Sequence, residues 1–199
     1  INHQQGTKHV RGLDRTILYN TRRANLLLEL FLEYHPDIRF HLEIHPALLS
    51  EELKEELKHL PEGLLHLEAG IQSLREPVLE KSRRMGKLTD ALEGLKFLCS
   101  LPNMETHADL IAGLPLYHLS EIFEDIRVLA AYGAGEIQLE SLKLLPGTEM
   151  RRRAEELGIQ YSPLPPYEVL QTREINVSEL QTARQLSRLL DGFYKTPAW

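Results

Sequence analysis

The chain has 199 residues, 42% of them hydrophobic and 26% charged, with a formal net charge of −6 and one cysteine. This composition is typical of a globular protein and excludes a disordered chain. The acidic balance argues against nucleic-acid binding, because such a surface needs clustered lysine and arginine. No apolar run approaches the roughly 18 residues of a membrane-spanning helix. The lone Cys99 excludes an internal disulfide, so we expect a soluble protein of a reducing, cytoplasmic compartment.

Short extended segments alternate with longer helical ones along most of the chain. We expect strands at residues 9–13, 39–45, 64–72, 104–113 and 136–144. We expect helices at 21–34, after an N-cap at Ser50, in a stretch broken near Gly86 that runs to about 100, at about 120–132, and at about 149–157 before a left-handed cap at Gly158. Five successive strand–helix units of this kind imply right-handed crossovers and a parallel sheet.

The second to fifth expected strands alternate apolar and polar side chains, so each of these four has one apolar and one polar face. In the second strand, for example, Leu42 and Ile44 share the apolar face, and His41 and Glu43 share the polar one. In a barrel the polar face lines the lumen, which ordinary βα barrels fill with Val, Ile and Leu. A lumen this polar is expected to hold a large polar ligand. One face of a half-covered sheet that meets water would give the same alternation, and both interpretations stay open.

A metal site is a rival interpretation of the polar face. Its candidate ligands are His41, Glu43, His45, His66, His107 and Asp109. Three such ligands and an open position suit a catalytic zinc ion. The chain would then be a metal-dependent hydrolase on a barrel. A non-catalytic binding module is the third interpretation.

The expected strand ends carry motifs that resemble a known family. The motifs are Leu13-Asp14-Arg15-Thr16, Phe40-His41-Leu42-Glu43-Ile44-His45-Pro46, Glu68-Ala69-Gly70-Ile71-Gln72-Ser73, Asp109-Leu110-Ile111-Ala112-Gly113-Leu114-Pro115 and Leu144-Leu145-Pro146-Gly147-Thr148. Their order and spacing resemble the radical S-adenosylmethionine (SAM) enzymes, in particular the cobalamin-binding type, and also the oxygen-independent coproporphyrinogen III oxidases. The resemblance covers about residues 8–167. It implies an α/β fold, a partial TIM-like barrel of the (βα)6 type with about five βα units present and a C-terminal helical tail.

The resemblance also implies a function and its cofactors. Members of the family use SAM and a [4Fe–4S] cluster, in some cases with cobalamin, and an electron donor such as flavodoxin or ferredoxin. Reductive cleavage of SAM gives a 5′-deoxyadenosyl radical, which abstracts hydrogen from a small-molecule substrate. The cofactor-binding positions carried over are Glu68, Gln72, Ser73, Arg83, Ile111, Gly113, Leu144 and Leu145. The positions expected to line the lumen near the substrate are Asp14, Arg15, His41, Glu43, His45, His107, Asp109, Glu140 and Lys143.

Two features depart from the family pattern. Leu116 and Tyr117 follow Pro115, where the family often has glycine and an acidic residue. The Cys-x-x-x-Cys-x-x-Cys loop that holds the cluster is absent, and Cys99 is expected to be a small buried residue in a helix. Because the chain starts at Ile1, we expect the C-terminal part of a barrel that is inactive alone and has no metal ligands of its own. The exposed edge of its first strand would then favour self-association.

The C-terminal part has a different pattern. Residues 162–167 hold three prolines and cannot form a regular helix. Ser178 and Gln181 fit a capping box that opens a last amphipathic helix. Its expected apolar face is Leu186, Leu189, Leu190 and Phe193. We therefore expect a partial barrel at 1–160 and a proline-rich connection with a C-terminal helix at 161–199.

Overall fold

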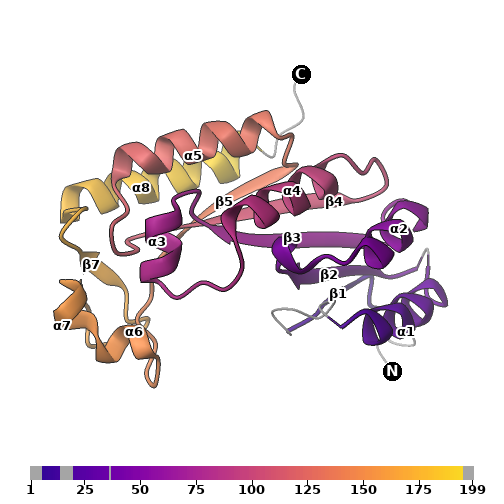
Figure 1. Cartoon of the computed structure of the whole chain (residues 1–199), viewed down its shortest axis with the longest axis horizontal. Helices are drawn as coiled ribbons and strands as arrows, with labels where there is room; N and C mark the ends of the chain where they lie inside the picture. Colours follow the sequence, from indigo (N-terminus) through magenta and orange to yellow (C-terminus); the bar gives the residue numbers. More distant parts are fainter. Residues whose placement is uncertain (1–5, 14–19, 36, 195–199) are drawn as a thin grey trace. The chain divides into compact units, whose positions relative to one another are not determined.

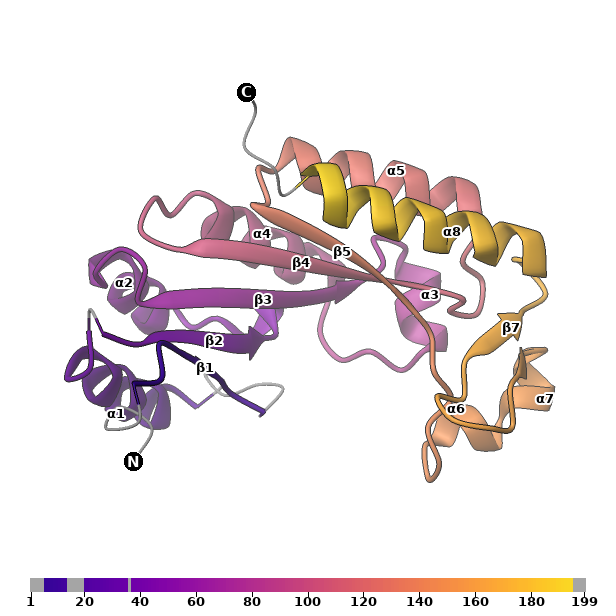
Figure 2. The ribbon, with the colours of Figure 1, turned by 180° about the vertical axis from the view of Figure 1, so that it is seen from behind.

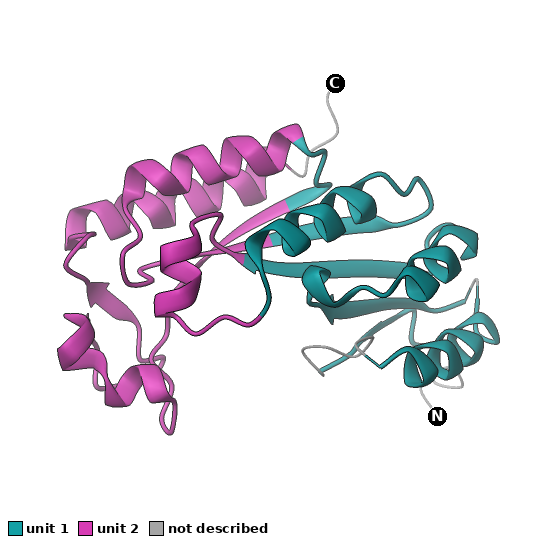
Figure 3. Ribbon diagram, viewed as in Figure 1, with its two compact units in different colours: residues 1–71, 86–108, 132–136 teal, residues 72–85, 109–131, 137–199 magenta. Residues whose placement is uncertain are grey.

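The computed structural model describes residues 6–13, 20–35 and 37–194 (Figure 1). The chain divides into two compact units (Figure 3). Unit 1 comprises residues 1–71, 86–108 and 132–136, and unit 2 comprises residues 72–85, 109–131 and 137–199. The described part of the chain has no helix with the length and apolar character needed to cross a membrane.

Five strands form one sheet in the order β1-β2-β3-β4-β5 (Figure 2). Each strand thus lies next to the strand that follows it in the chain, as in a series of successive βα units. The strands are β1 His9–Arg11, β2 Arg39–Ile44, β3 Leu65–Gln72, β4 Glu105–Ala112 and β5 Glu136–Ser141. The first three pair in parallel, with His41 opposite His66 and Glu43 opposite Glu68. All five predicted strands are therefore present. The fifth ends three residues early, because Leu142, Lys143 and Leu144 pair with other segments of unit 2.

Burial follows the predicted alternation. In β2 the residues Phe40, Leu42 and Ile44 are buried, and the polar residues between them are partly exposed. In β5 the same pattern places Ile137 and Leu139 in the core. Strands β2 and β5 thus have one face in the core and one polar face, which is the arrangement on which the functional prediction depends. In β3 and β4 the polar residues Glu68 and His107 are buried as well.

Among the described residues, three α-helices belong to unit 1, together with a short 3₁₀ helix at Pro46–Leu48. They are α1 Thr21–Leu32, α2 Glu51–His59 and α4 Leu88–Cys99. Helix α1 packs on the sheet through stacked rings of Phe31 and Phe40, whose centroids are 3.9 Å apart. The Ser50 hydroxyl accepts a hydrogen bond from the backbone N–H of Leu53, so the predicted cap of α2 is confirmed.

Unit 2 contains α3 Glu76–Lys81, α5 Leu119–Ala131, α6 Glu149–Arg152, α7 Ala154–Leu157, α8 Val177–Leu189 and a π-helical turn at Leu190–Tyr194. Helices α5 and α8 lie side by side (Figures 1 and 2). The helix expected at 149–157 is two short helices interrupted at Arg153. The predicted left-handed cap at Gly158 is confirmed by its φ of +67°.

The C-terminal segment corrects three expectations. An antiparallel hairpin, β6 Gln160–Tyr161 with β7 Val169–Gln171, lies where no regular structure was predicted. The capping box of α8 consists of Asn176 and Glu179, not of Ser178 and Gln181. Its buried residues are Leu180 and Ala183, followed by Leu190, whereas Leu189 and Phe193 are exposed.

Candidate functional site

The carboxylate of Glu68 is the centre of an ionic network on the polar face of unit 1. Its Oε2 atom accepts hydrogen bonds from Arg11 Nη2 at 2.6 Å and His41 Nε2 at 2.8 Å. The Arg11 guanidinium also lies 3.6 Å from Glu43. Glu68 itself is almost fully buried, so its negative charge depends on these partners. The resemblance assigns Glu68 to SAM, and the structure shows a carboxylate already held by a cation and an imidazole.

A second network lies on neighbouring strands of the same unit. Glu105 Oε2 lies 2.9 Å from Arg39 Nη2 and 3.2 Å from His66 Nδ1. The hydrogen bond from Arg39 holds the pKa of Glu105 below its usual value, although burial acts in the opposite direction. His107 Nδ1 lies 3.5 Å from Glu136 Oε1. The face is therefore built from alternating acids, arginines and histidines.

A pocket of about 340 Å³ opens onto this face. It is lined by His9, Val10, Arg11, Arg39, His41 and His66. All six belong to β1, β2 and β3 of unit 1. The pocket gives solutes access to the imidazoles of His41 and His66.

The structure brings together three of the six candidate metal ligands. His41, His66 and His107 each offer a nitrogen within 4.8 Å of the other two. Glu43, His45 and Asp109 are not part of this group. His45 follows β2 and is buried, next to Gly86. Asp14 and Arg15 lie outside the described residues.

In unit 2 the segment after β3 is fixed by a buried carboxylate. Asp125, on α5, accepts hydrogen bonds from the Leu74 N–H at 2.8 Å, from Arg75 Nε at 3.0 Å and from the Tyr117 hydroxyl at 2.6 Å. The Ser73 hydroxyl points to the same carboxylate at 3.5 Å and accepts the Arg75 N–H. Burial, and then the Asp125 charge beside it, raise the pKa of Tyr117 above its usual value.

This buried network adjoins Gln72, the last residue of β3. Gln72 has a φ of +75°, in the left-handed region that residues other than glycine rarely adopt. Such a conformation persists only where the surroundings enforce it. The hydrogen bonds of Ser73 and Leu74 to Asp125 provide that enforcement.

At the end of β4, Ile111 is half-buried and Gly113 has a φ of +91°. A Cβ at Gly113 would lie 3.4 Å from Val169 and 3.6 Å from Leu142 and Leu180. Glycine is thus required here by the backbone angle, and its neighbours are side chains of the same unit.

After β5, the backbone of Leu144 is already paired. Its N–H donates to the Tyr167 carbonyl at 2.8 Å, and its carbonyl accepts from Arg151 Nη1 at 3.0 Å. Leu144 is buried and Leu145 is about half exposed. A ligand that used the backbone here would share these groups with the C-terminal segment.

The remaining predicted site residues are spread over unit 2. Arg83 pairs with Glu149 at 2.6 Å and lines a separate pocket of about 210 Å³. Glu140 lies 3.6 Å from Lys143. Asp109 lies half-buried on β4.

Several residues of these networks were not among the predicted site residues, namely Arg11, Arg39, Glu105, Tyr117, Asp125 and Glu136. Strand alternation could have indicated Glu105, because it lies two residues before His107 on β4 and therefore on the same face. Asp125 could have been found from helical spacing, because it lies between Ile122 and Leu129 on the apolar stripe of α5.

Comparison with solved structures identifies the fold. The chain superposes on the radical SAM methyltransferase TsrM from Kitasatospora setae, with cobalamin and a [4Fe–4S] cluster bound, at a TM-score of 0.66 and 19% identity. The superposition covers 93% of this chain and 39% of that one. TsrM with tryptophan and a SAM analogue bound gives a TM-score of 0.65 at 18% identity, over 93% of this chain and 38% of that one. Coproporphyrinogen III oxidase HemN from Escherichia coli gives a TM-score of 0.53 at 17% identity, over 71% of this chain and 38% of that one.

Comparisons of sequence add less. A family model described as a protein of unknown function, DUF4080, matches residues 155–198. The search of curated proteins gives no match.

The chain therefore has the partial βα-barrel fold of the radical SAM enzymes, with a C-terminal helix, and the fold prediction is confirmed. It spans about two fifths of the length of the solved structures that it matches.

Proposed function

We propose that this chain is part of a radical SAM enzyme, in which it provides most of the barrel that surrounds SAM and the substrate. The fold likeness over 93% of the chain carries this proposal, and the strand-end motifs of the sequence support it independently. SAM, when reduced by one electron, supplies a 5′-deoxyadenosyl radical that abstracts hydrogen from the substrate. The expected partners are a small-molecule substrate and an electron donor such as flavodoxin or ferredoxin.

The residues of this chain do not fit the iron–sulfur cluster. Such clusters need several cysteine thiolates, and the chain has one cysteine. Cys99 is the last residue of α4, and burial raises the pKa of its thiol to about 11, which disfavours the thiolate. We propose that the cluster ligands lie outside these 199 residues and that the chain alone is inactive.

Gln72 is the residue of this chain that best supports a SAM contact. Catalytic and binding sites of parallel α/β folds lie at the carboxyl ends of strands, and Gln72 ends β3. Its left-handed φ is held in place by the buried network around Asp125. Enforced strain of this kind clusters at ligand sites.

The carboxylate of Glu68 and the side-chain amide of Gln72 would bind and orient SAM. Glu68 is held by Arg11 and His41, so its charge is fixed in one orientation. A fixed carboxylate can accept hydrogen bonds from ribose hydroxyls without reorganising. The backbone pairing of Leu144 and the hydroxyl pairing of Ser73 suggest that these two residues position the neighbouring loops.

The rival proposal of a metal-dependent hydrolase has weaker support. His41 and His107 are the third residues of β2 and β4, and His66 is the second residue of β3. These three histidines therefore lie in the amino-terminal half of their strands, whereas hydrolytic sites on βα barrels lie at the carboxyl ends of the strands.

The proposal is tested by anaerobic reconstitution with iron and sulfide, followed by reduction and measurement of 5′-deoxyadenosine. We expect the 199-residue chain to hold no stoichiometric cluster and to form no 5′-deoxyadenosine. A longer protein that joins this chain to a Cys-x-x-x-Cys-x-x-Cys segment should form both. Failure of the longer protein to cleave SAM would contradict the proposed activity, and cleavage by the chain alone would contradict its proposed inactivity.

A pair of variants of the longer protein tests the SAM contact. Gln72→Ala is expected to weaken SAM binding by about tenfold, the loss typical of one hydrogen bond to a bound ligand. Gln138→Ala is the matched control, because it makes the same substitution on β5 away from a strand end. Equal SAM affinity in both variants would remove Gln72 from the site.

A further inference from the structure

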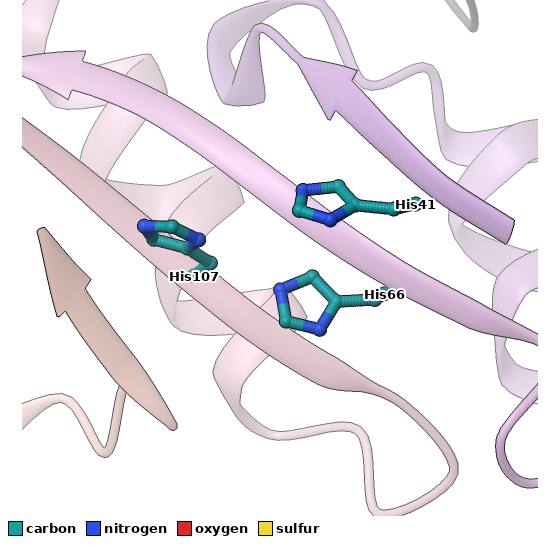
Figure 4. Close-up of side chains that lie close together, drawn as sticks. All are labelled: His41, His66 and His107. Carbon is teal, nitrogen blue, oxygen red and sulfur yellow. The ribbon is translucent and has the colours of Figure 1, made fainter. Parts of the chain in front are cut away.

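Three histidines of unit 1 come together on the polar face of β2, β3 and β4 (Figure 4). The ring centroids of His41 and His66 are 4.4 Å apart, and that of His107 lies 6.4 Å and 5.9 Å from them. One nitrogen of each ring lies within 4.8 Å of the other two. Figure 4 shows the three side chains close together, with the rings of His41 and His66 extending toward His107. Sheet pairing alone assembles this histidine cluster, since the three residues are far apart in the sequence.

We propose that the histidine cluster binds one divalent first-row transition-metal ion, for which Zn²⁺ serves as the reference ligand. Imidazole nitrogen suits zinc, cobalt and nickel, and three histidines with an open position form a known type of zinc site. In a tetrahedral site with Zn–N bonds of about 2.1 Å, the nitrogens are about 3.4 Å apart. The rings therefore need small rotations toward one another to close on an ion. The proposal is independent of the proposed function.

Each histidine of the cluster faces a carboxylate. The pairs are His41 with Glu68 at 2.8 Å, His66 with Glu105 at 3.2 Å and His107 with Glu136 at 3.5 Å. Histidines that bind metals almost always direct the other ring nitrogen to a carboxylate or carbonyl, which fixes the ring and raises its basicity. The carboxylates of Glu68 and Glu105, which are hydrogen-bonded to His41 and His66, would orient these two rings for a metal ion.

One nitrogen of the histidine cluster lacks a partner within the described part of the protein. The Nε2 atom of His66 is buried and has no hydrogen-bond partner among the described residues. An unpaired buried nitrogen is costly, and a metal ion would satisfy it.

Charge and access also favour a cation. Three carboxylates, of Glu68, Glu105 and Glu136, lie next to the cluster histidines, and two guanidinium groups, of Arg11 and Arg39, pair with the first two of these carboxylates. This leaves an excess of negative charge that a divalent ion would neutralise. The pocket of about 340 Å³ reaches His41 and His66, so an ion can enter from solvent.

The test uses the 199-residue chain after treatment with a chelator. Zn²⁺ is titrated in competition with a chromophoric chelator, and Co²⁺ is titrated with detection of its visible d–d absorption. We expect one ion per chain. Imidazole ¹H–¹⁵N correlation spectra of the wild type should show that three of the nine histidines respond to Zn²⁺. Absence of binding, or a response from other histidines, would overturn the proposal.

Variants assign the site. His66→Asn and His107→Asn are each expected to lower Zn²⁺ affinity by at least about tenfold. Glu105→Gln leaves all three rings in place and is expected to lower affinity through the orientation of His66. His59→Asn is the matched control, because His59 is exposed in the last turn of α2. Unchanged affinity in His66→Asn would refute the assignment, and the wild-type spectra decide the case if a variant fails to fold.

Discussion

The hydroxyl of Tyr117 donates a 2.6 Å hydrogen bond to the carboxylate of Asp125, and both side chains are fully buried in unit 2. The same carboxylate accepts from the backbone of Leu74 and from Arg75. A buried charge is tolerated only when it is paired and hydrogen-bonded. Asp125 therefore links α5 to the segment that follows β3, and so supports the strained backbone of Gln72.

Removal of the Tyr117 hydroxyl is expected to destabilise the protein. Tyr117→Phe should lower the free energy of unfolding by about 1.5–3 kcal/mol, the range for a hydrogen bond to a charged group. Urea denaturation followed by circular dichroism measures the change. Tyr132→Phe is the control, because it removes the same hydroxyl from a partly exposed tyrosine. An equal effect in both variants would show that the bond to Asp125 adds nothing.

Gly94 is a second position where packing decides the outcome. It lies in the interior of α4, where helix propensity alone predicts that alanine stabilises by about 1 kcal/mol. A Cβ at Gly94 would lie only 2.1 Å from the Pro46 carbonyl oxygen. We therefore expect Gly94→Ala to destabilise by about 1–3 kcal/mol, the cost of overpacking. Thermal unfolding tests the sign, with Glu93→Ala as the exposed control on the same helix, and a stabilised Gly94→Ala would refute the contact.

Local signals predicted most of the fold. The N-cap of α2 depends on the hydroxyl oxygen of Ser50 next to the first turn, and the C-cap of α7 depends on the left-handed φ that Gly158 can adopt. Both caps were predicted correctly. Strand alternation likewise predicted the polar face. The hairpin of β6 and β7 was missed because its strands are too short to show a period.

The candidate site was less predictable, because it depends on how strands pair. His41 lies opposite His66 only in the observed register, and a slip of one residue would move one of them to the core face. The approach of His107 depends in the same way on pairing across β4. Polarity at each position could be read from the sequence, but which side chains meet could not.

The capping box of α8 illustrates a local ambiguity that variants can resolve. Asn176-x-x-Glu179 and Ser178-x-x-Gln181 fit the same pattern, and the structure selects the first, with Asn176 Oδ1 accepting the Glu179 N–H at 3.0 Å. Asn176→Ala should lower the free energy of unfolding by about 1 kcal/mol. Ser178→Ala should change it by less than about 0.5 kcal/mol, since Ser178 is exposed inside the helix. Chemical denaturation of the two variants measures these changes. A larger loss in Ser178→Ala than in Asn176→Ala would support the capping box of Ser178 and Gln181 instead.

Cys99 gives a prediction that depends on pH. Burial raises the pKa of its thiol to about 11, whereas an unfolded cysteine has a pKa of about 8.5. At pH 8 about 24% of the unfolded thiols but only about 0.1% of the folded thiols are thiolates, so the folded fraction is roughly 240-fold smaller. We expect iodoacetamide to alkylate the native chain roughly 200-fold more slowly at pH 8 than the chain in guanidinium. The native rate should rise until about pH 11, and Cys99→Ser should show no labelling at all.

The same shift affects stability, and its sign can be stated. The folded state holds the thiol proton more tightly than the unfolded state does. The stability that this tighter proton binding contributes is complete below about pH 8.5, the pKa of the unfolded thiol. It is lost as the pH rises through the pKa of the folded thiol, about 11. The free energy of unfolding of the wild type should therefore fall relative to that of Cys99→Ala across this interval. Parallel pH profiles for the two proteins, or equally fast native alkylation at pH 8, would show that the thiol is not shielded by burial in α4.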